Sequence, residues 1–314
     1  MNKRSLKTWT TAALIAAFLS PVLAPPSAQA APDSGPSAYI NSGKAYGSVL
    51  IREGNTFVTL TDLKNLGSYS FRYDKANQQV TISTKGTQAV LTIGSKTLQI
   101  NDKKTTLPVA PFLYKGKTMM PLRAVSEAFG AKIYWNGPAK TAYIAKPDAK
   151  VIADLKSGNL TTARNAALQV PIISSIPKPS PEMTYMEMQG VNYYFPKGKA
   201  DKYFEVDNDL ASYYEIRNNI VELKWQAKLD YAKGKNAKSG IFFLSHHFVK
   251  EIGKQPDVNG WTVAEFKFRY PVGVTTYRLL NGKGEISGGF AELDNQSPSY
   301  QGVIVEIPEE SGTK

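Results

Sequence analysis

The chain has 314 residues, a formal net charge of +12 at pH 7 and an apolar content of 42%, which is ample for folded cores and argues against disorder. It contains no cysteine, which excludes disulfides, thiol catalysis, thiolate metal sites and a lipid anchor on an N-terminal cysteine. A chain of this length exceeds the usual size of one domain, so the sequence predicts two.

Residues 1–30 have the pattern of a cleavable export signal. Basic residues open the segment, and an apolar run follows in residues 11–24. Ala28 and Ala30 then supply the small side chains of a cleavage site. The apolar run is too short for a transmembrane anchor and is broken by a proline. We expect cleavage before Ala31, which removes three basic and no acidic residues and lowers the formal charge from +12 to +9.

The segment 115–146 predicts a strand, a helix and a hairpin in succession. Pro121 suits the first turn of a helix, because the N–H that it lacks has no helical partner there. Leu122, Val125 and Phe129 follow at spacings of three and four, which places them on one helical face. A glycine then ends the helix, and two alternating strands around a turn complete the unit.

The segment 56–82 repeats this pattern. Thr56 corresponds to Thr118 and Ile82 corresponds to Ile144, and an Ile–Asn pair also recurs upstream of each copy. Two such copies, each with one apolar face, are expected to share a core. After a leader of residues 31–37, we therefore predict an α+β domain over residues 38–147, with a duplicated strand–helix–hairpin unit and a mainly antiparallel sheet.

This repeated pattern resembles the copper amine oxidase N-terminal-like domain, also called a stalk domain, of proteins secreted by Gram-positive bacteria. The resemblance covers roughly residues 37–145, under half of the chain. It implies a module that precedes an oxidase, and not the oxidase chemistry. The residues that carry the resemblance are Met120, Pro121, Leu122, Arg123, Val125, Glu127, Phe129, Gly130, Ala131, Ile133, Tyr134, Trp135 and Asn136.

Copper amine oxidase activity itself can be tested against the residues. By resemblance it would require three histidine copper ligands and a tyrosine between an asparagine and an acidic residue. This chain has only His246 and His247, and Tyr193 follows Asn192 but is not followed by an acidic residue. Adjacent residues of a strand point to opposite faces, so the two histidines are not expected to share a metal ion. We predict no cofactor, no metal site and no catalytic residue.

Beyond the repeat, residues 148–182 are predicted to be a helical and Pro-rich linker, and residues 183–310 a β-rich domain. Residues 221–231 alternate apolar and polar side chains, which predicts a long strand with one buried and one solvated face. Residues 281–282 are an Asn–Gly hairpin turn, and residues 303–307 read as a last strand. The pattern favours a sandwich or an open barrel.

Two kinds of side chain in the second domain are candidates for function. Tyrosines crowd its first third, and Tyr193 with Tyr194 is the pair that we assign to ligand binding, since tyrosine rings can stack on sugars. Packing of these rings in the core is the alternative. Carboxylates that could act as acid and base in a glycosidase-like cleft are a further alternative, and they are Glu182, Glu187, Glu205, Asp207 and Asp209.

Together these features predict a secreted, non-catalytic protein of the cell envelope. A stalk-like module would present a β domain that binds a cell-wall or extracellular ligand, and the basic mature chain would favour an anionic cell-wall polymer or a glycan. An extracellular hydrolase with carboxylate acid and base residues is one alternative, and a regulator or inhibitor of another exported protein is another. Nucleic acid is not an expected partner, and no transmembrane segment is expected after cleavage.

Overall fold

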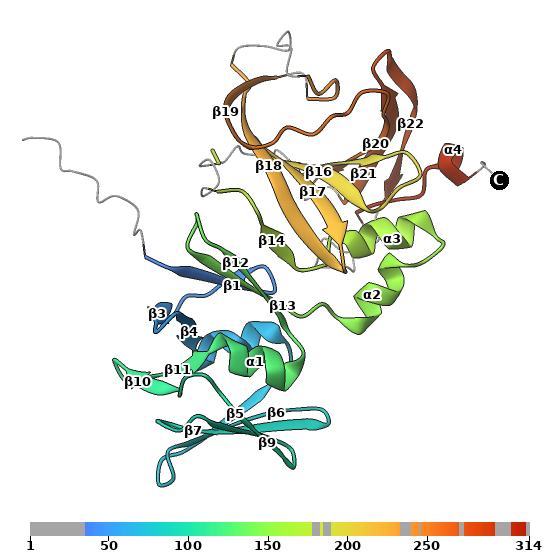
Figure 1. Ribbon diagram of the computed structural model, residues 1–314. Helices are drawn as coiled ribbons and strands as arrows, with labels where there is room; N and C mark the ends of the chain where they lie inside the picture. The colour runs from blue at the N-terminus through green and yellow to red at the C-terminus, as the bar shows by residue number, and fades with distance from the viewer. Residues whose placement is uncertain are drawn as a thin grey trace, which may run out of the picture. The chain divides into compact units, whose positions relative to one another are not determined.

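The computed structural model describes residues 35–177, 183–184, 190–232, 240–244, 246–269, 273–292 and 303–311 (Figure 1). The predicted export signal and most of the leader lie outside this part of the chain. The described residues are mostly β-structure in antiparallel sheets, and the region after residue 190 is rich in strands, as predicted. None of the helices described here is long and apolar enough to cross a membrane.

A four-stranded sheet joins the two repeated segments. Its strands follow the order β10–β11–β4–β3, with Val58 opposite Met120 and Phe57 opposite Pro121. Val58 and Met120 are equivalent positions in the two segments, so the two hairpins of this sheet are related by an approximate two-fold axis through that pair. The strands are β3 (Leu50–Arg52), β4 (Asn55–Thr59), β10 (Phe112–Tyr114) and β11 (Lys117–Pro121).

The two hairpins of this sheet also turn in the same way. Glu53 and Gly54 both have positive φ, and so do Lys115 and Gly116 at the equivalent turn. Two successive residues with positive φ are typical of the type I′ turn, whose twist matches that of the flanking strands. The glycine allows this conformation without a steric cost.

A helix follows each central strand, and a hairpin follows each helix. The first helix, η1 (Leu60–Leu66), is a 3-10 helix, and the second, α1 (Leu122–Phe129), is an α-helix. In η1 the apolar residues Leu63 and Leu66 are buried. The hairpins are β5 (Ser70–Asp74) with β6 (Gln79–Thr84), and β12 (Lys132–Asn136) with β13 (Thr141–Ala145).

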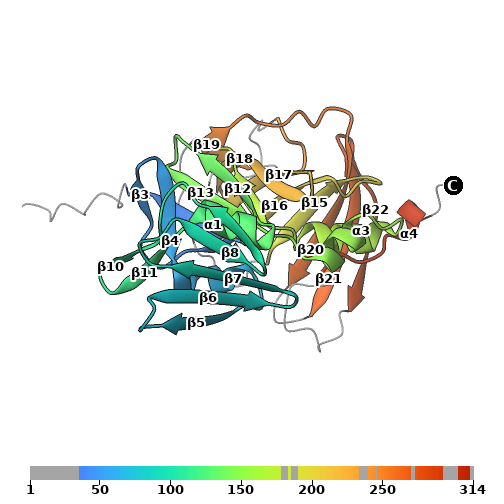
Figure 2. The same ribbon diagram turned by 60° about the horizontal axis from the view of Figure 1, so that its bottom comes forward.

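The two hairpins then enter different sheets. The first continues into an antiparallel five-stranded sheet, β5–β6–β7–β8–β9, whose ribbons lie side by side in Figure 2. The second pairs with the start of the chain, where β1 runs parallel to β13. The remaining strands of these sheets are β1 (Ser37–Ile40), β2 (Gly43–Lys44), β7 (Thr87–Thr92), β8 (Thr97–Ile100) and β9 (Lys103–Thr106).

One hydrophobic core serves both repeated segments. Leu122 and Phe129 of α1 are buried, while Arg123 is exposed, so α1 presents the predicted face to the core. The side chain of Val125 lies outside the described part. Equivalent residues of both segments meet in this core, among them Val58 with Met120, Leu66 with Phe129, and Ile82 with Ile144.

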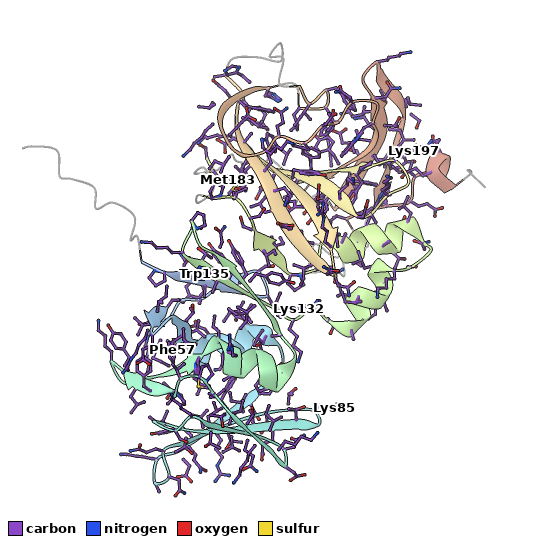
Figure 3. All side chains as sticks on the ribbon, in the orientation of Figure 1. Phe57, Lys85, Lys132, Trp135, Met183 and Lys197 are labelled. Carbon is purple, nitrogen blue, oxygen red and sulfur yellow. The ribbon has the colours of Figure 1, made fainter. Side chains whose placement is uncertain are left out.

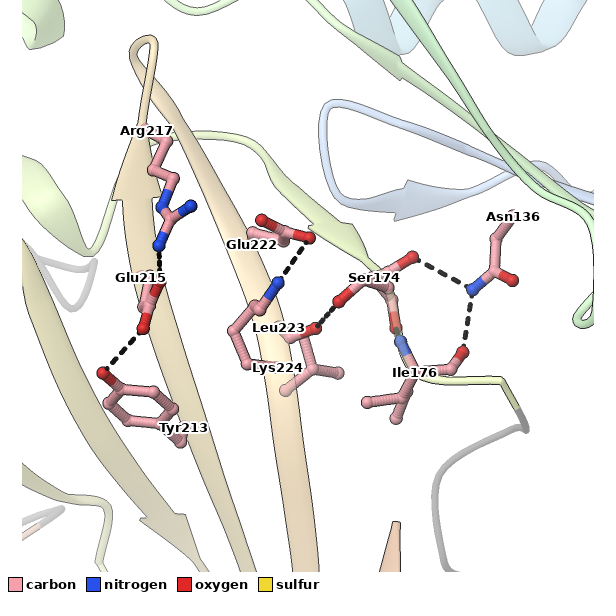
Figure 4. A network of polar contacts seen from close by, with 10 residues as sticks. Asn136, Ser174, Ile176, Tyr213, Glu215, Arg217, Glu222, Leu223 and Lys224 are labelled. Atoms are coloured by element: carbon pink, nitrogen blue, oxygen red, sulfur yellow. Dashed lines mark hydrogen bonds and ion pairs between the residues drawn. The ribbon is translucent and has the colours of Figure 1, made fainter. Parts of the chain in front are cut away.

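The predicted linker is only partly a spacer. Two helices, α2 (Ala149–Leu155) and α3 (Leu160–Ala167), are capped by the side chains of Asp148 and Asn159. The short strand β14 (Ile172–Ser174) then joins the edge of the C-terminal sheet. In Figure 4 the Nδ2 atom of Asn136 donates to the carbonyl oxygens of Ser174 (3.0 Å) and Ile176 (2.8 Å). The end of the linker is thereby tied to β12.

The C-terminal region forms one sheet of nine strands. The order is β14–β18–β17–β16–β15–β20–β21–β22, and β19 pairs with β18 on the side opposite β17, farther along the strand than β14. The strands therefore belong to one sheet and not to the two packed sheets of a sandwich. Their bounds are β15 (Asn192–Pro196), β16 (Lys202–Asp207), β17 (Leu210–Arg217), β18 (Ile220–Asp230), β19 (His247–Gly253), β20 (Thr262–Arg269), β21 (Val274–Asn281) and β22 (Gly284–Glu292).

The long strand predicted over residues 221–231 is present as β18, but its apolar side chains do not share one face. A β-bulge in its pairing with β17 falls between Leu223 and Trp225. Such a bulge inserts one extra residue and reverses the alternation. Val221 and Leu223 accordingly pack in one core and Trp225 in the other. The predicted solvated face is also partly covered, because Gln226 is 4% exposed.

The predicted last strand over residues 303–307 is wrong. These residues form no strand, and a short helix, α4 (Pro308–Ser311), follows them. Val303, Ile304 and Ile307 are nevertheless buried against the C-terminal sheet. Their apolar alternation therefore reflects burial and not strand pairing. The predicted hairpin at Asn281 is present, because β21 and β22 pair on either side of this turn.

Candidate functional site

The two tyrosines assigned to ligand binding lie inside the C-terminal domain. Tyr193 is 6% and Tyr194 5% exposed, and adjacent positions on β15 direct them into different cores. The Tyr194 ring stacks on Phe243 with 4.7 Å between centroids, and its hydroxyl is hydrogen-bonded to Glu265. This burial favours the packing alternative. Replacing both tyrosines would therefore disturb two cores.

The other aromatic residues of this crowded region also pack on both sides of the sheet. Tyr203 stacks on Phe195 (5.2 Å) and on Tyr214 (4.9 Å) on one side. On the other side Phe204 contacts Tyr213 (4.7 Å) and Phe243 (5.0 Å). Large rings gain more from such burial than from exposure, so the crowding indicates a core.

Two of the candidate carboxylates, Glu205 and Asp207, lie on one face of β16. Residues two apart in a strand point the same way. Burial, followed by the neighbouring Asp207, raises the pKa of Glu205 to about 7. Burial also raises the pKa of Asp207, although its carboxylate accepts a hydrogen bond from Asn208 (2.8 Å). Within the described part of the chain, Glu205 has no hydrogen bond or ion pair to its carboxyl group.

Asp209, the third described candidate carboxylate, has partners of its own. Asp209 accepts a hydrogen bond from the backbone N–H of Thr184 (2.7 Å) and lies 3.4 Å from the Nζ atom of Lys228. Glu182 and Glu187 lie outside the described residues. The structure therefore places two of the three described candidates, Glu205 and Asp207, on one face of β16. Burial raises the pKa of both, and a value of about 7 for Glu205 is that expected of a general acid near neutral pH.

The unusual environment of Glu205 predicts a pH-dependent stability. Its carboxyl ionises near pH 7 in the folded chain but near its ordinary value of 4.5 when unfolded. The folded state therefore holds a proton that the unfolded state has lost, and stability falls as pH rises from about 4.5 to 7. We expect Glu205→Gln to raise the free energy of unfolding at about pH 8 by roughly 2–3 kcal/mol, with little change at about pH 4.5.

Urea unfolding at the two pH values measures this difference. Glu222→Gln is the matched control, because Glu222 lies on β18 of the same sheet, beyond β17, and already pairs with Lys224 at 3.0 Å. Its effect should not grow with pH in this window. The same change in stability for Glu205→Gln at both pH values would show that Glu205 is ionised at neutral pH.

The two histidines do not converge on a metal site. His247 opens β19 and is exposed, while the His246 ring lies 4.3 Å from the Tyr231 ring. Among the residues described, no cluster of three or more His, Asp or Glu side chains could hold a metal ion. We therefore assign no function to either histidine.

Comparison with known protein families identifies the N-terminal region. Residues 40–167 match the family model of the copper amine oxidase N-terminal domain. The resemblance predicted from the repeated segments is thereby confirmed, and the match extends through α2 and α3. The copper amine oxidase N-terminal domain is non-catalytic. The match covers less than half of the chain. No curated protein and no solved structure matches the chain.

A concentration of positive charge lies within the region that matches the copper amine oxidase N-terminal domain. Residues 70–117 contain eight basic and two acidic residues, a net charge of +6. The basic residues are Arg72, Lys75, Lys85, Lys96, Lys103, Lys104, Lys115 and Lys117, and all are exposed. None of them takes part in an ion pair with another described residue. Counting charges in sequence windows would have found this segment.

Proposed function

We propose that this chain is an exported, non-catalytic protein of the cell envelope that binds an anionic polymer. The observation that carries the proposal is the net charge of +6 on residues 70–117, whose basic side chains are exposed and unpaired within the described part. An exposed surface with one sign of charge attracts polyanions. The signal-like residues 1–30 support export, and the C-terminal sheet would add a second contact to a wall or extracellular ligand.

The N-terminal region supports a duplicated module. We infer that residues 56–82 and 118–144 arose from one strand–helix–hairpin unit. The pairing of Val58 with Met120 at equivalent positions, the matching turns and the shared core support this origin. A duplicated module whose two halves share one core suits a rigid support for other surfaces.

Binding to isolated cell wall tests the proposal. We expect the mature protein to be retained on purified anionic wall at low salt and released as ionic strength rises, because exposed charges are screened within about 8 Å at physiological salt. A pull-down across a salt series measures this. Absence of retention at low salt would contradict an envelope-binding role.

A hydrolase is the second candidate, and Glu205 with Asp207 favours it. A carboxyl with a pKa of about 7 beside a second carboxyl is the combination that glycoside hydrolysis uses for acid and base. The same wall preparation can be assayed for released fragments. Release that Glu205→Gln abolishes would establish the hydrolase and displace the non-catalytic proposal.

A further inference from the structure

The positive charge of the N-terminal domain is concentrated at the five-stranded sheet. Its basic side chains form no ion pair with a described acidic residue: Lys75, Lys85 and Lys96 lie at turns, and Arg72, Lys103 and Lys104 lie in strands. Asp74 is one of only two acidic residues in the segment, and its carboxylate is used within its own turn, accepting from Ala76 N (2.9 Å) and Asn77 Nδ2 (2.8 Å). These bonds lower the pKa of Asp74. It stabilises a turn and does not neutralise a lysine.

Antiparallel pairing sorts the turns between the two ends of this sheet. The β6–β7 turn holds Lys85, and the β8–β9 turn leads directly into Lys103. Both turns lie at the same end, because two strands separate one turn from the other. Lys75 and Lys96 belong to turns at the opposite end. Lys85 is labelled at the end of the sheet in Figure 3.

Asn101 holds the two turns of the first end together. Its Oδ1 atom accepts from the backbone N–H of Gln88 (2.8 Å), and its Nδ2 atom donates to the carbonyl oxygen of Gly86 (3.3 Å). Its own N–H donates to the carbonyl oxygen of Gln88 (2.8 Å). These bonds fix the backbone that carries Lys85 and Lys103 on adjacent turns. Residues 100–105 line a recess at this hairpin.

From this arrangement we propose that the sheet end formed by Lys85, Lys103 and Lys104, the basic sheet end, binds a linear polymer with repeated phosphate groups. Lys103 and Lys104 are successive residues of the edge strand β9 and point to opposite faces. They can therefore contact successive phosphates of a chain that passes over the edge. Asp102 lies in the same hairpin, and its negative charge lowers the net positive charge of the basic sheet end. The proposal rests on the envelope role for its biological setting only.

A polymer fits this surface better than a membrane does. None of the large exposed apolar side chains of the described part belongs to residues 79–106. A protein that lies on a bilayer usually inserts such side chains beside its basic residues. Basic residues that point to opposite faces of the sheet also cannot all contact one flat membrane surface. The arrangement suits a flexible chain that bends around the edge.

Direct binding to medium-chain inorganic polyphosphate tests the basic sheet end. The probe is titrated into the mature protein at several salt concentrations. We expect the triple variant Lys85→Glu, Lys103→Glu and Lys104→Glu to lose about tenfold or more in affinity at low salt. The dependence of log Kd on log salt should also become shallower, because fewer phosphates are neutralised.

A matched triple variant separates the local site from net charge. Lys250→Glu, Lys254→Glu and Lys283→Glu change exposed lysines of the C-terminal domain and alter the formal charge equally. It should keep most of the affinity, and circular dichroism melts should confirm that both triples fold. Equal losses in the two triples would overturn the proposal in favour of net charge. Binding to anionic phospholipid vesicles but not to polyphosphate would overturn it in favour of a membrane.

The failure of this inference is distinguishable from failure of the proposed function. Polyphosphate binding by the purified protein does not depend on export or on the wall. The protein could be retained on wall while the Lys85, Lys103 and Lys104 triple variant keeps its affinity for polyphosphate. That result would support the envelope role and reject the basic sheet end as the binding site. Polyphosphate binding through the basic sheet end without wall retention would do the reverse.

Discussion

Replacing Arg164 by alanine should lower the free energy of unfolding of the C-terminal domain by about 3–5 kcal/mol. The Arg164 guanidinium makes two hydrogen bonds to the Glu310 carboxylate, at 2.6 and 2.9 Å, and both side chains are almost fully buried. It also donates to the carbonyl oxygens of Lys199 (2.9 Å) and Pro196 (3.1 Å). Removing it leaves a buried carboxylate and two carbonyl groups with fewer partners.

The same guanidinium packs against aromatic rings. Its central carbon lies 5.2 Å from the Phe195 ring centroid and 5.6 Å from that of Phe266. Such contacts add to the ion pair when they are shielded from water. Arg164 therefore joins α3, the β15–β16 connection and α4 through one side chain, which is why its loss should be felt throughout the domain.

Urea unfolding followed by tryptophan fluorescence, to which the fully buried Trp225 contributes, measures the effect. Arg217→Ala is the control, because Arg217 pairs with Glu215 on the surface and should cost under about 1 kcal/mol. The double variant Arg164→Met and Glu310→Leu should recover much of the loss, since it leaves no unpaired buried charge. Equal costs for Arg164→Ala and Arg217→Ala would show that the buried pair contributes nothing.

The second large effect is expected in the N-terminal domain. Phe129→Ala should destabilise it by about 3–5 kcal/mol, because the ring is 7% exposed and packs edge-on against Tyr69 with 4.8 Å between centroids. The cavity would open in the core that both repeated segments share. Thermal unfolding of the mature protein, followed by circular dichroism, measures the loss.

Arg123→Ala is the matched control for Phe129. Arg123 lies on the same helix but is exposed, so its removal should cost under about 1 kcal/mol. Similar small losses in both variants would show that α1 does not present Phe129 to the core. Loss of the ring should also weaken the packing of η1, because Tyr69 lies only three residues after the end of that helix.

The sequence alone determined the local elements of this protein. Spacings of three and four placed α1 correctly, the positions of glycine and Asn281 located the turns, and the repeated segments predicted the shared core and the family. These features depend on backbone preferences and on neighbours along the chain, which any short window of sequence contains.

Tertiary structure decided where alternating side chains point. The apolar alternation of residues 221–231 indicated one buried face, but a bulge opposite β17 divides it between two cores. Apolar alternation at residues 303–307 indicated a strand, yet these residues fill a core without pairing. In both segments, burial stabilises apolar side chains at alternating positions. A strand also needs a neighbouring strand to pair with, and the local sequence does not show which strand that is.

The candidate sites were decided in the same way. Tyr193 and Tyr194 are candidates by residue type, and only the sheet places them in two interiors. Arg164 and Glu310 are 146 residues apart, so no sequence window contains the pair. The raised pKa of Glu205 depends on the strands around it. The sequence gives the number of charged residues. Their burial and their pairing arise only when distant segments pack together and exclude water from the charged groups.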